Sequence, residues 1–172
     1  YGLVAMGLVH PSRVRRNAAA KPGDVLVLGK PLGVGVYSAA LKKLMLSDAG
    51  YREMIENTTR LNTPGPLLAE LDGVHAITDV TGFGLAGHAL EMARGAGVTV
   101  QIDCAKVPLL PGVEQLASDG FVTGASGRNW AAYGGEVRVA QGLPATTQNL
   151  LSDPQPSGGL LVACAPGAVK EV

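Results

Sequence analysis

The stretch Thr78-Asp79-Val80-Thr81-Gly82-Phe83-Gly84-Leu85-Ala86-Gly87-His88 decides the fold, because it joins two apolar patterns of different period. The run before it, residues 74–78, is short, apolar and partly β-branched, which predicts a buried strand. After it, apolar side chains recur at helical spacing, at Leu85, Ala89, Met92 and Ala96. We therefore expect residues 79–84 to link the carboxyl end of a strand to the first turn of a helix, where open α/β sheets bind ligands.

The residue types in this loop favour a site for phosphate and a metal ion. Glycines at 82 and 84 let a ligand approach the backbone closely, and the free N–H groups of a helix start attract anions. The carboxylate of Asp79 would repel a phosphate, but a Mg²⁺ ion between them removes the conflict, because Mg²⁺ is commonly held by carboxylates together with phosphate oxygens. A tight turn in which Asp79 caps the helix is the alternative that the residues leave open.

A second alternative is a dinucleotide site. Residues 82–87 spell G-x-G-x-x-G after a strand, and Asp103 ends the next expected strand about 20 residues on, as the NAD-binding fingerprint requires. Against this, residues 79–81 lengthen a turn that should be tight and place an anion near the pyrophosphate. An NAD-binding oxidoreductase domain that uses this loop remains an alternative.

Composition limits the functional classes. The chain has 172 residues, of which 47% are hydrophobic and 16% charged, so one domain with a full core is expected. Lys and Arg number 14, as do Asp and Glu, so no net charge attracts nucleic acid or an anionic membrane. Cys104 and Cys164 lack partners at metal spacing, which indicates buried free thiols. With neither a signal peptide nor a membrane span in this sequence, we expect a cytoplasmic protein.

The rest of the chain alternates between short strands and helices. Strands are expected over residues 3–9, 25–28, 98–102 and 160–164, and helices over 36–46, 48–59, 67–71 and 113–118. Residues 120–135 are rich in glycine and predict an ordered loop, in which Arg128 or Asn129 would face a ligand or partner.

No catalytic constellation can be assembled from these residues. Lys30 follows a strand in a glycine-rich junction, but the spacing is not that of a phosphate-binding P-loop. A surface lysine is expected, and a lysine that reaches a ligand at the sheet edge is the alternative. His10, His75 and His88 have no partners at ligand spacing and are expected to be structural. The residues alone thus provide one metal-binding carboxylate and no nucleophile.

The central motif, together with residues 109–114 (LLPGVE), 127–129 (GRN) and 153–161 (DPQPSGGLL), resembles the selenophosphate synthetase (selenide, water dikinase) family, and the resemblance runs through almost the whole chain. It implies an α/β (α+β) fold like the carboxyl-terminal domain of aminoimidazole ribonucleotide synthetase, with a mixed sheet covered by helices. Residues 1–10 would end the connection from an amino-terminal ATP-binding domain, and residues 11–172 would form the carboxyl-terminal domain, truncated at its end.

The resemblance also implies an activity. The family converts ATP, selenide and water to selenophosphate, AMP and phosphate, requires Mg²⁺ and forms homodimers. Asp79 falls on one of the family's metal-binding aspartates, and the backbone at Thr81, Gly82 and Gly84 would approach the ATP phosphates. The reactive Cys or selenocysteine belongs to the other half of the family's sequence, so we expect no catalytic residue here and no activity of the chain alone.

One departure from the family pattern stands out. Pro156 replaces the usual Thr, which removes a hydroxyl and a backbone donor from the loop of residues 153–159. A non-catalytic interaction domain of the same fold is therefore a further alternative. Thiamine-monophosphate kinase and hydrogenase-maturation proteins share the fold of this family and are near alternatives to the selenophosphate synthetase assignment.

Overall fold

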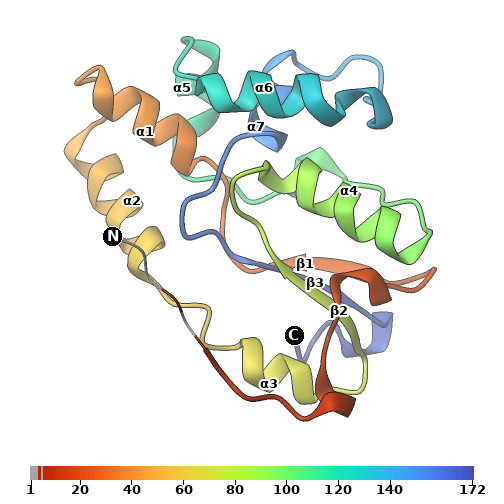
Figure 1. Ribbon diagram of the computed structural model, residues 1–172. Coiled ribbons are helices and arrows are strands. Elements are labelled where there is room, and N and C mark those ends of the chain that lie inside the picture. The colour runs from red at the N-terminus through yellow and green to blue at the C-terminus, as the bar shows by residue number, and fades with distance from the viewer. Residues whose placement is uncertain (1–3, 5) are drawn as a thin grey trace.

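The computed structural model describes residue 4 and residues 6–172, and places α-helices on both faces of a small sheet (Figure 1). The strands and helices are, in chain order, β1 (Val25–Leu28), α1 (Val34–Lys42), α2 (Asp48–Thr59), α3 (Gly65–Glu70), β2 (Val74–Asp79), α4 (Gly84–Ala96), α5 (Val113–Ser118), α6 (Gly124–Tyr133), α7 (Thr146–Leu151) and β3 (Leu160–Cys164). Short 3₁₀ turns lie at Pro11–Arg13, Asn17–Ala19, Cys104–Lys106, Gly134–Glu136 and Pro166–Ala168.

The sheet has three strands in the order β1-β3-β2, and both ladders are antiparallel. The last strand, β3, thus returns between the first two and pairs Leu160 with Asp79 at the end of β2. The α+β class with helical cover is confirmed. The expected mixed sheet, however, is antiparallel in the described residues, where the parallel pairing is an isolated bridge between Leu32 and Leu109.

Helix α4 packs its apolar stripe onto the sheet, as its periodicity predicts. Leu85, Ala89 and Met92 are buried in one cluster with Ala76 of β2 and Ala163 of β3. The small alanines let helix and sheet approach closely. The helix ends at Gly97, whose left-handed φ of 67° is typical of a C-terminal glycine cap.

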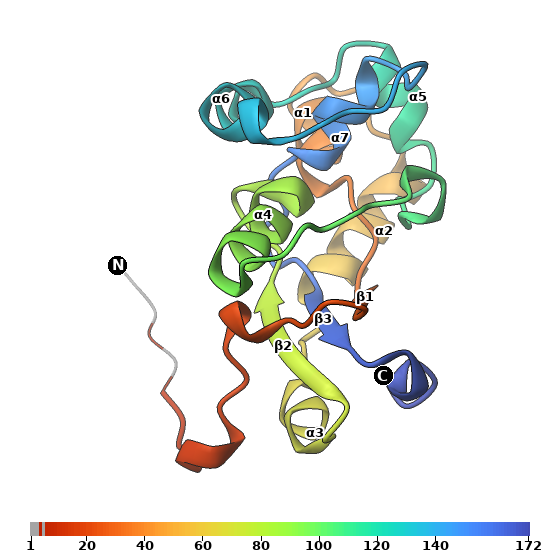
Figure 2. The ribbon, with the colours of Figure 1, turned by 90° about the vertical axis from the view of Figure 1, so that its right-hand side faces the viewer.

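The other helices form two further layers. Figure 2 shows α4 between the sheet and a layer that contains α6 and α7, while α3 lies on the opposite side of the sheet. A second apolar cluster joins α1, α2, α5 and α7, and a third joins α3 to the outer face of β2 and β3. The start of α4 therefore lies beneath the helical layer, close to α6 and α7.

Several expected elements have the expected bounds, and others differ. Strands 25–28 and 160–164 and helices 48–59 and 113–118 are confirmed. No strand forms in the described part of residues 3–9, since residues 4 and 6–9 have no regular structure; residues 3 and 5 lie outside the described residues. Residues 98–102 are also not a strand: their apolar side chains pack on the core, but no described strand pairs with their backbone.

The glycine-rich stretch 120–135 is not a loop, because α6 occupies most of it. Thr123 caps this helix, its Oγ1 accepting the Ser126 N–H at 3.1 Å. Trp130 and Tyr133 pack on the main core. A side-chain cap and an apolar face thus override the low helix propensity of the glycines. Helix α7 was not expected at all.

The described helices do not include one with both the length and the apolar character needed to cross a bilayer. Both cysteines are free thiols, with Cys164 buried and Cys104 partly buried.

Candidate functional site

Asp79 ends β2 with its side chain exposed, and α4 begins five residues later at Gly84. Among the described residues, the Asp79 carboxylate has no hydrogen-bond or ion-pair partner. The residue before the first turn of α4 is Phe83, and no side chain caps this helix. The alternative in which Asp79 serves as a helix cap is therefore wrong, and its carboxylate is free to meet a ligand.

The backbone carbonyls of the loop 81–83 all point into the protein. The Thr81 carbonyl accepts the N–H groups of Gly84 at 3.1 Å and Gln155 at 3.0 Å. The Gly82 carbonyl accepts Nδ2 of Asn129 at 2.7 Å, and the Phe83 carbonyl accepts the Tyr133 hydroxyl at 2.6 Å.

The amide groups of this loop have the opposite orientation. In a trans peptide the N–H points away from the preceding carbonyl. The N–H groups of Gly82 and Phe83 therefore point away from the partners of Thr81 and Gly82, and in the described residues neither finds an acceptor. Both residues are exposed. Successive outward N–H groups beside a helix start are suited to binding an anion.

The two glycines of the loop differ in what their backbone requires. Gly84 has a φ of +72°, and a Cβ there would lie 2.6 Å from the carbonyl carbon of Ser152. Its N–H is already used within the turn, so Gly84 is needed for close packing. A Cβ at Gly82 would meet no atom within 4 Å, which leaves the outer side of the loop open.

The three histidines have structural neighbours, as expected. His88 Nε2 lies 3.2 Å from Oγ1 of Thr81, so the helix holds the threonine side chain of the loop. His75 pairs with Asp24 at 2.8 Å, and His10 lies 2.7 Å from Ser12 Oγ. None of these contacts places a histidine beside a nucleophile.

Two side chains of the loop 153–159 point into the protein and cap the start of α1. Oδ2 of Asp153 accepts the N–H groups of Gly35 at 3.0 Å and Val36 at 3.3 Å. Oε1 of Gln155 accepts those of Gly33 at 3.1 Å and Val34 at 3.2 Å. These two buried side chains thus satisfy the four amide groups that the start of a helix leaves free.

Burial makes Asp153 a weaker acid. Loss of solvent raises the pKa of its carboxyl from 3.8 to about 6, although the amide hydrogen bonds from Val36 and Gly35 act in the opposite direction. Its Oδ2 is occupied by groups within the fold, and the whole side chain is buried, so Asp153 is not accessible to a ligand from solvent.

Lys30 lies in the interior, which corrects the expected surface position. Its ammonium donates to the carbonyls of Asn57 at 3.1 Å, Arg60 at 2.6 Å and Ser157 at 2.7 Å. Burial, and secondarily the charge of Arg60, lowers its pKa. Two of these carbonyls lie at the carboxyl end of α2, where a helix dipole favours a cation. Lys30 thus ties α2 to the loop 153–159.

Pro156 lies exposed at the tip of this loop. The Gly158 N–H donates to the Gln155 carbonyl at 3.0 Å, and Ser157 has a φ of 54°, so residues 155–158 form a turn of type II with proline at its second position. Proline fits this position, and the departure from the family pattern therefore leaves the turn intact.

Of the two residues in α6 proposed to face a ligand, Asn129 instead faces the protein. Its Nδ2 donates to Gly82 and also to the Ser152 carbonyl at 3.1 Å, while Arg128 is exposed. The sequence showed no signal for this contact, because it joins segments 47 residues apart. Helical spacing from Asn129 to Tyr133 could have indicated a shared face only once the helix was recognised.

The described residues offer no complete metal site of their own. In residue 4 and residues 6–172, no group of three or more His, Cys, Asp or Glu side chains is placed to hold a metal ion. Asp79 therefore fits Mg²⁺ as a single carboxylate ligand, and the remaining ligands have to come from phosphate oxygens, water or residues outside this chain.

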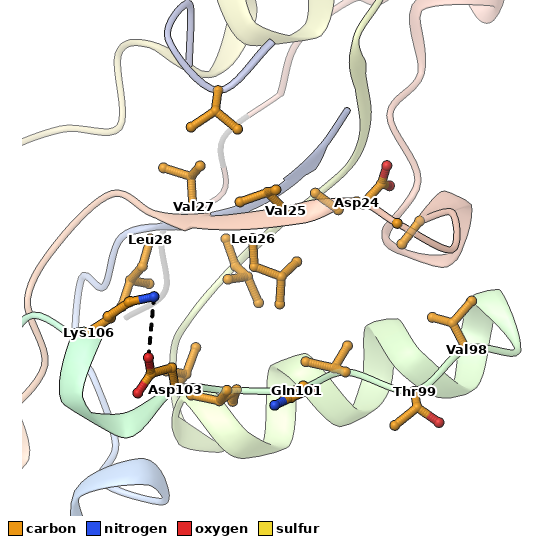
Figure 3. Close-up of a pocket in the computed structure, with 18 of the residues that line it drawn as sticks. Asp24, Val25, Leu26, Val27, Leu28, Val98, Thr99, Gln101, Asp103 and Lys106 are labelled. Atoms are coloured by element: carbon orange, nitrogen blue, oxygen red, sulfur yellow. Dashed lines mark ion pairs between the residues drawn. The ribbon is translucent and has the colours of Figure 1, made fainter. Parts of the chain in front are cut away.

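A hollow lies elsewhere, between β1 and the extended residues 98–102 (Figure 3). Its volume is about 690 Å³, and its walls are mainly aliphatic. Charged residues lie at its two ends: Asp24 at one, and the Asp103–Lys106 ion pair at the other, with 3.4 Å between the charged atoms. No polar groups of the 79–83 loop line it.

The dinucleotide alternative is wrong. Its fingerprint requires a parallel β-α-β unit, but residues 98–102 form no strand and the sheet is antiparallel. Asp103 caps the next 3₁₀ turn through the Ala105 N–H at 3.2 Å. A Cβ at Gly87 would lie 2.6 Å from that of Phe83, so the third glycine serves internal packing.

Comparison with known proteins agrees with this fold. The family model described as AIR synthase related protein, C-terminal domain, matches residues 21–172. A selenide, water dikinase from Burkholderia pseudomallei is 67% identical over 172 residues, which are 100% of this chain and 49% of the relative. One from Pseudomonas straminea is 62% identical over all of this chain and 48% of its own length. The chain thus spans about half the length of these relatives.

Solved structures with the same fold are more distant in sequence. Thiamine-monophosphate kinase from Stenotrophomonas maltophilia has a TM-score of 0.62 at 18% identity, covering 95% of this chain and 46% of the kinase. The hydrogenase maturation protein HypE in complex with ATP has a TM-score of 0.61 at 16% identity, covering 95% of this chain and 40% of HypE. The chain belongs to the family of C-terminal domains of AIR synthase related proteins.

Proposed function

We propose that this chain is the carboxyl-terminal half of a selenide, water dikinase, which makes selenophosphate from ATP, selenide and water and releases AMP and phosphate. The 67% identity to a relative of that name, over all of this chain, supports the assignment. The complete protein would form a homodimer, mostly through its amino-terminal half, and this half would depend on the amino-terminal half for the nucleophile.

The observation that supports a ligand role is the free carboxylate of Asp79 beside the loop 81–83, in which the N–H groups of Gly82 and Phe83 point outward. We place Mg²⁺ at Asp79, together with phosphate oxygens of ATP and ligands outside this chain. There Mg²⁺ would neutralise charge that develops on the transferred phosphoryl groups.

The loop residues bind and orient in this proposal. The N–H groups of Gly82 and Phe83 would donate to phosphate oxygens. Oγ1 of Thr81, which lies on the same loop 3.2 Å from His88 Nε2, would orient the ligand. Gly84 would act indirectly, since its left-handed backbone makes the turn possible.

The experiment uses the full-length protein that contains this domain. Phosphorus NMR would follow ATP with and without selenide, and selenide-dependent formation of selenophosphate and AMP is expected. The Asp79→Asn variant should lose this conversion, whereas Asp72→Asn, which changes an exposed aspartate at the other end of β2, should keep it. ATP that stays intact in the wild-type protein would reject the function and favour the non-catalytic interaction domain.

A further inference from the structure

The carbonyl contacts of the loop 81–83 come from outside the loop, and two of them come from one helix. Asn129 and Tyr133 lie four residues apart in α6 and therefore face the same way. Asn129 Nδ2 is 2.7 Å from the Gly82 carbonyl, and the Tyr133 hydroxyl is 2.6 Å from the Phe83 carbonyl.

We infer that Asn129 and Tyr133 are positioning residues. Asn129 holds the Gly82 carbonyl inward and so fixes the free Phe83 N–H toward the phosphate, while Tyr133 holds the Phe83 carbonyl inward and so keeps closed the turn that presents this N–H. This inference rests on the proposed function for the identity of the ligand. Neither side chain is expected to touch the ligand, because each already uses its donor within the protein.

The geometry of the peptide unit connects each contact to the ligand side. Rotation of the peptide between Gly82 and Phe83 would turn the carbonyl outward and the Phe83 N–H inward. A carbonyl dipole would then face the phosphate and repel it. The Asn129 amide prevents this rotation by binding the carbonyl on the inner side.

Asn129 also connects the loop 81–83 to Ser152, the residue just before the loop 153–159. Its Nδ2 contacts the Ser152 carbonyl at 3.1 Å as well as Gly82. Ser152 is buried, and its backbone packs on Gly84. The Asn129 side-chain amide thus fixes the turn of residues 81–84 to a buried part of the fold.

Tyr133 provides a rigid second contact. Its side chain is buried in the main core, and burial raises the pKa of its hydroxyl to about 12, so it remains a donor at neutral pH. Its contact fixes the Phe83 carbonyl and, through the same peptide, the direction of the Gly84 N–H that closes the turn on Thr81.

The test compares Asn129→Ala and Tyr133→Phe with Asn62→Ala in the full-length protein. Asn62 is the matched control, because its Nδ2 also donates to a loop carbonyl, that of Gly158 at 2.9 Å, but not to the loop 81–83. We expect Asn129→Ala to raise KM for Mg·ATP about tenfold, the equivalent of one lost hydrogen bond. Tyr133→Phe should raise it less, and Asn62→Ala should leave it unchanged.

Hydrogen exchange provides a readout that does not require activity. In the absence of ligand, Asn129→Ala should speed amide exchange in a peptide that covers residues 80–88 and leave the exchange of β1 and β3 unchanged. Wild-type KM values and wild-type exchange in both α6 variants would overturn the inference. If the wild-type protein does not consume ATP but exchange changes as expected, the proposed function fails and the positioning role stands.

Discussion

The loops 79–84 and 153–159 contain the same kinds of residue and use them in opposite ways. Each has an aspartate and glycines beside a strand, and the two lie in contact through Thr81 and Gln155. Asp79 is exposed without a partner, whereas Asp153 has an exposed fraction of 0% and caps α1. A loop carboxylate is therefore available to a ligand only if no helix start in the fold uses it as a hydrogen-bond acceptor.

The largest expected effect separates the two aspartates by stability. Asp153→Ala would leave the N–H groups of Gly35 and Val36 and the Gln155 amide without their buried acceptor, at a cost of about 1–3 kcal/mol each. We expect the free energy of unfolding to fall by at least about 3 kcal/mol, measured by urea titration. Asp79→Ala should change it by less than about 0.5 kcal/mol, since nothing in the fold depends on it. Equal losses in the two variants would remove the distinction.

Gly84 and Gly82 allow a comparison of a packed and an open position within one loop. Gly84→Ala places a Cβ 2.6 Å from Ser152 at a φ of +72°, so the free energy of unfolding should fall by about 2–3 kcal/mol. Gly82→Ala meets open space and should be close to neutral in stability while weakening Mg·ATP binding. Thermal unfolding and ATP titration of both variants in the full-length protein check this. A stable Gly84→Ala protein would show that the close packing is not required.

The buried carboxyl also predicts a dependence on pH. Because burial raises the pKa of Asp153 from 3.8 to about 6, the folded chain binds more protons than the unfolded chain between these values. This group's contribution to the free energy of unfolding is therefore full below pH 3.8 and falls as pH rises to about 6, by at most about 3 kcal/mol. Urea titrations at several pH values should show that Asp153→Asn lacks this decline. Parallel profiles for the two proteins would contradict the assignment.

The smallest expected effect concerns Pro156, which lies at the exposed tip of the loop 153–159. Pro156→Thr restores the residue type usual in the family, and should lower the free energy of unfolding by about 0.4–1 kcal/mol, because proline restricts the unfolded chain. Turnover of the full-length protein should be unchanged, since Pro156 lies in a turn whose hydrogen bond joins Gln155 and Gly158. A large gain in turnover in the Pro156→Thr variant would instead assign the loop a ligand role.

Sequence patterns predicted the parts of the fold that depend on local periodicity. The strand–loop–helix unit around Asp79 was predicted because an apolar run and a helical stripe meet there. The strand pairing was not, since β1 at residues 25–28 pairs with β3 at residues 160–164, and so distant a partner leaves no local signal. Helix α6 was missed because its Thr123 cap and core contacts outweigh its glycines.

The candidate site likewise contains residues that the sequence could indicate and residues that it could not. Asp79 and Gly82 could be selected from residue chemistry and loop position, and they stay predictions as ligand-binding residues. The burial of Lys30 and the contacts of Asn129 depend on tertiary neighbours distant in sequence, so no pattern could indicate them. The histidines have hydrogen-bond partners within the fold, as expected of structural residues, and the absence of a ligand role stays a prediction.

The most direct test of Asp79 as a metal ligand is the Mg²⁺ dependence of selenide-dependent ATP turnover in the full-length protein, compared between Asp79→Asn and Asp72→Asn. We expect Asp79→Asn to lower turnover at least about a hundredfold and to raise the Mg²⁺ concentration needed for half-maximal activity, because a metal ligand is lost. Asp72→Asn should match the wild type in both. Wild-type turnover and Mg²⁺ dependence in Asp79→Asn would show that Asp79 does not hold the metal ion.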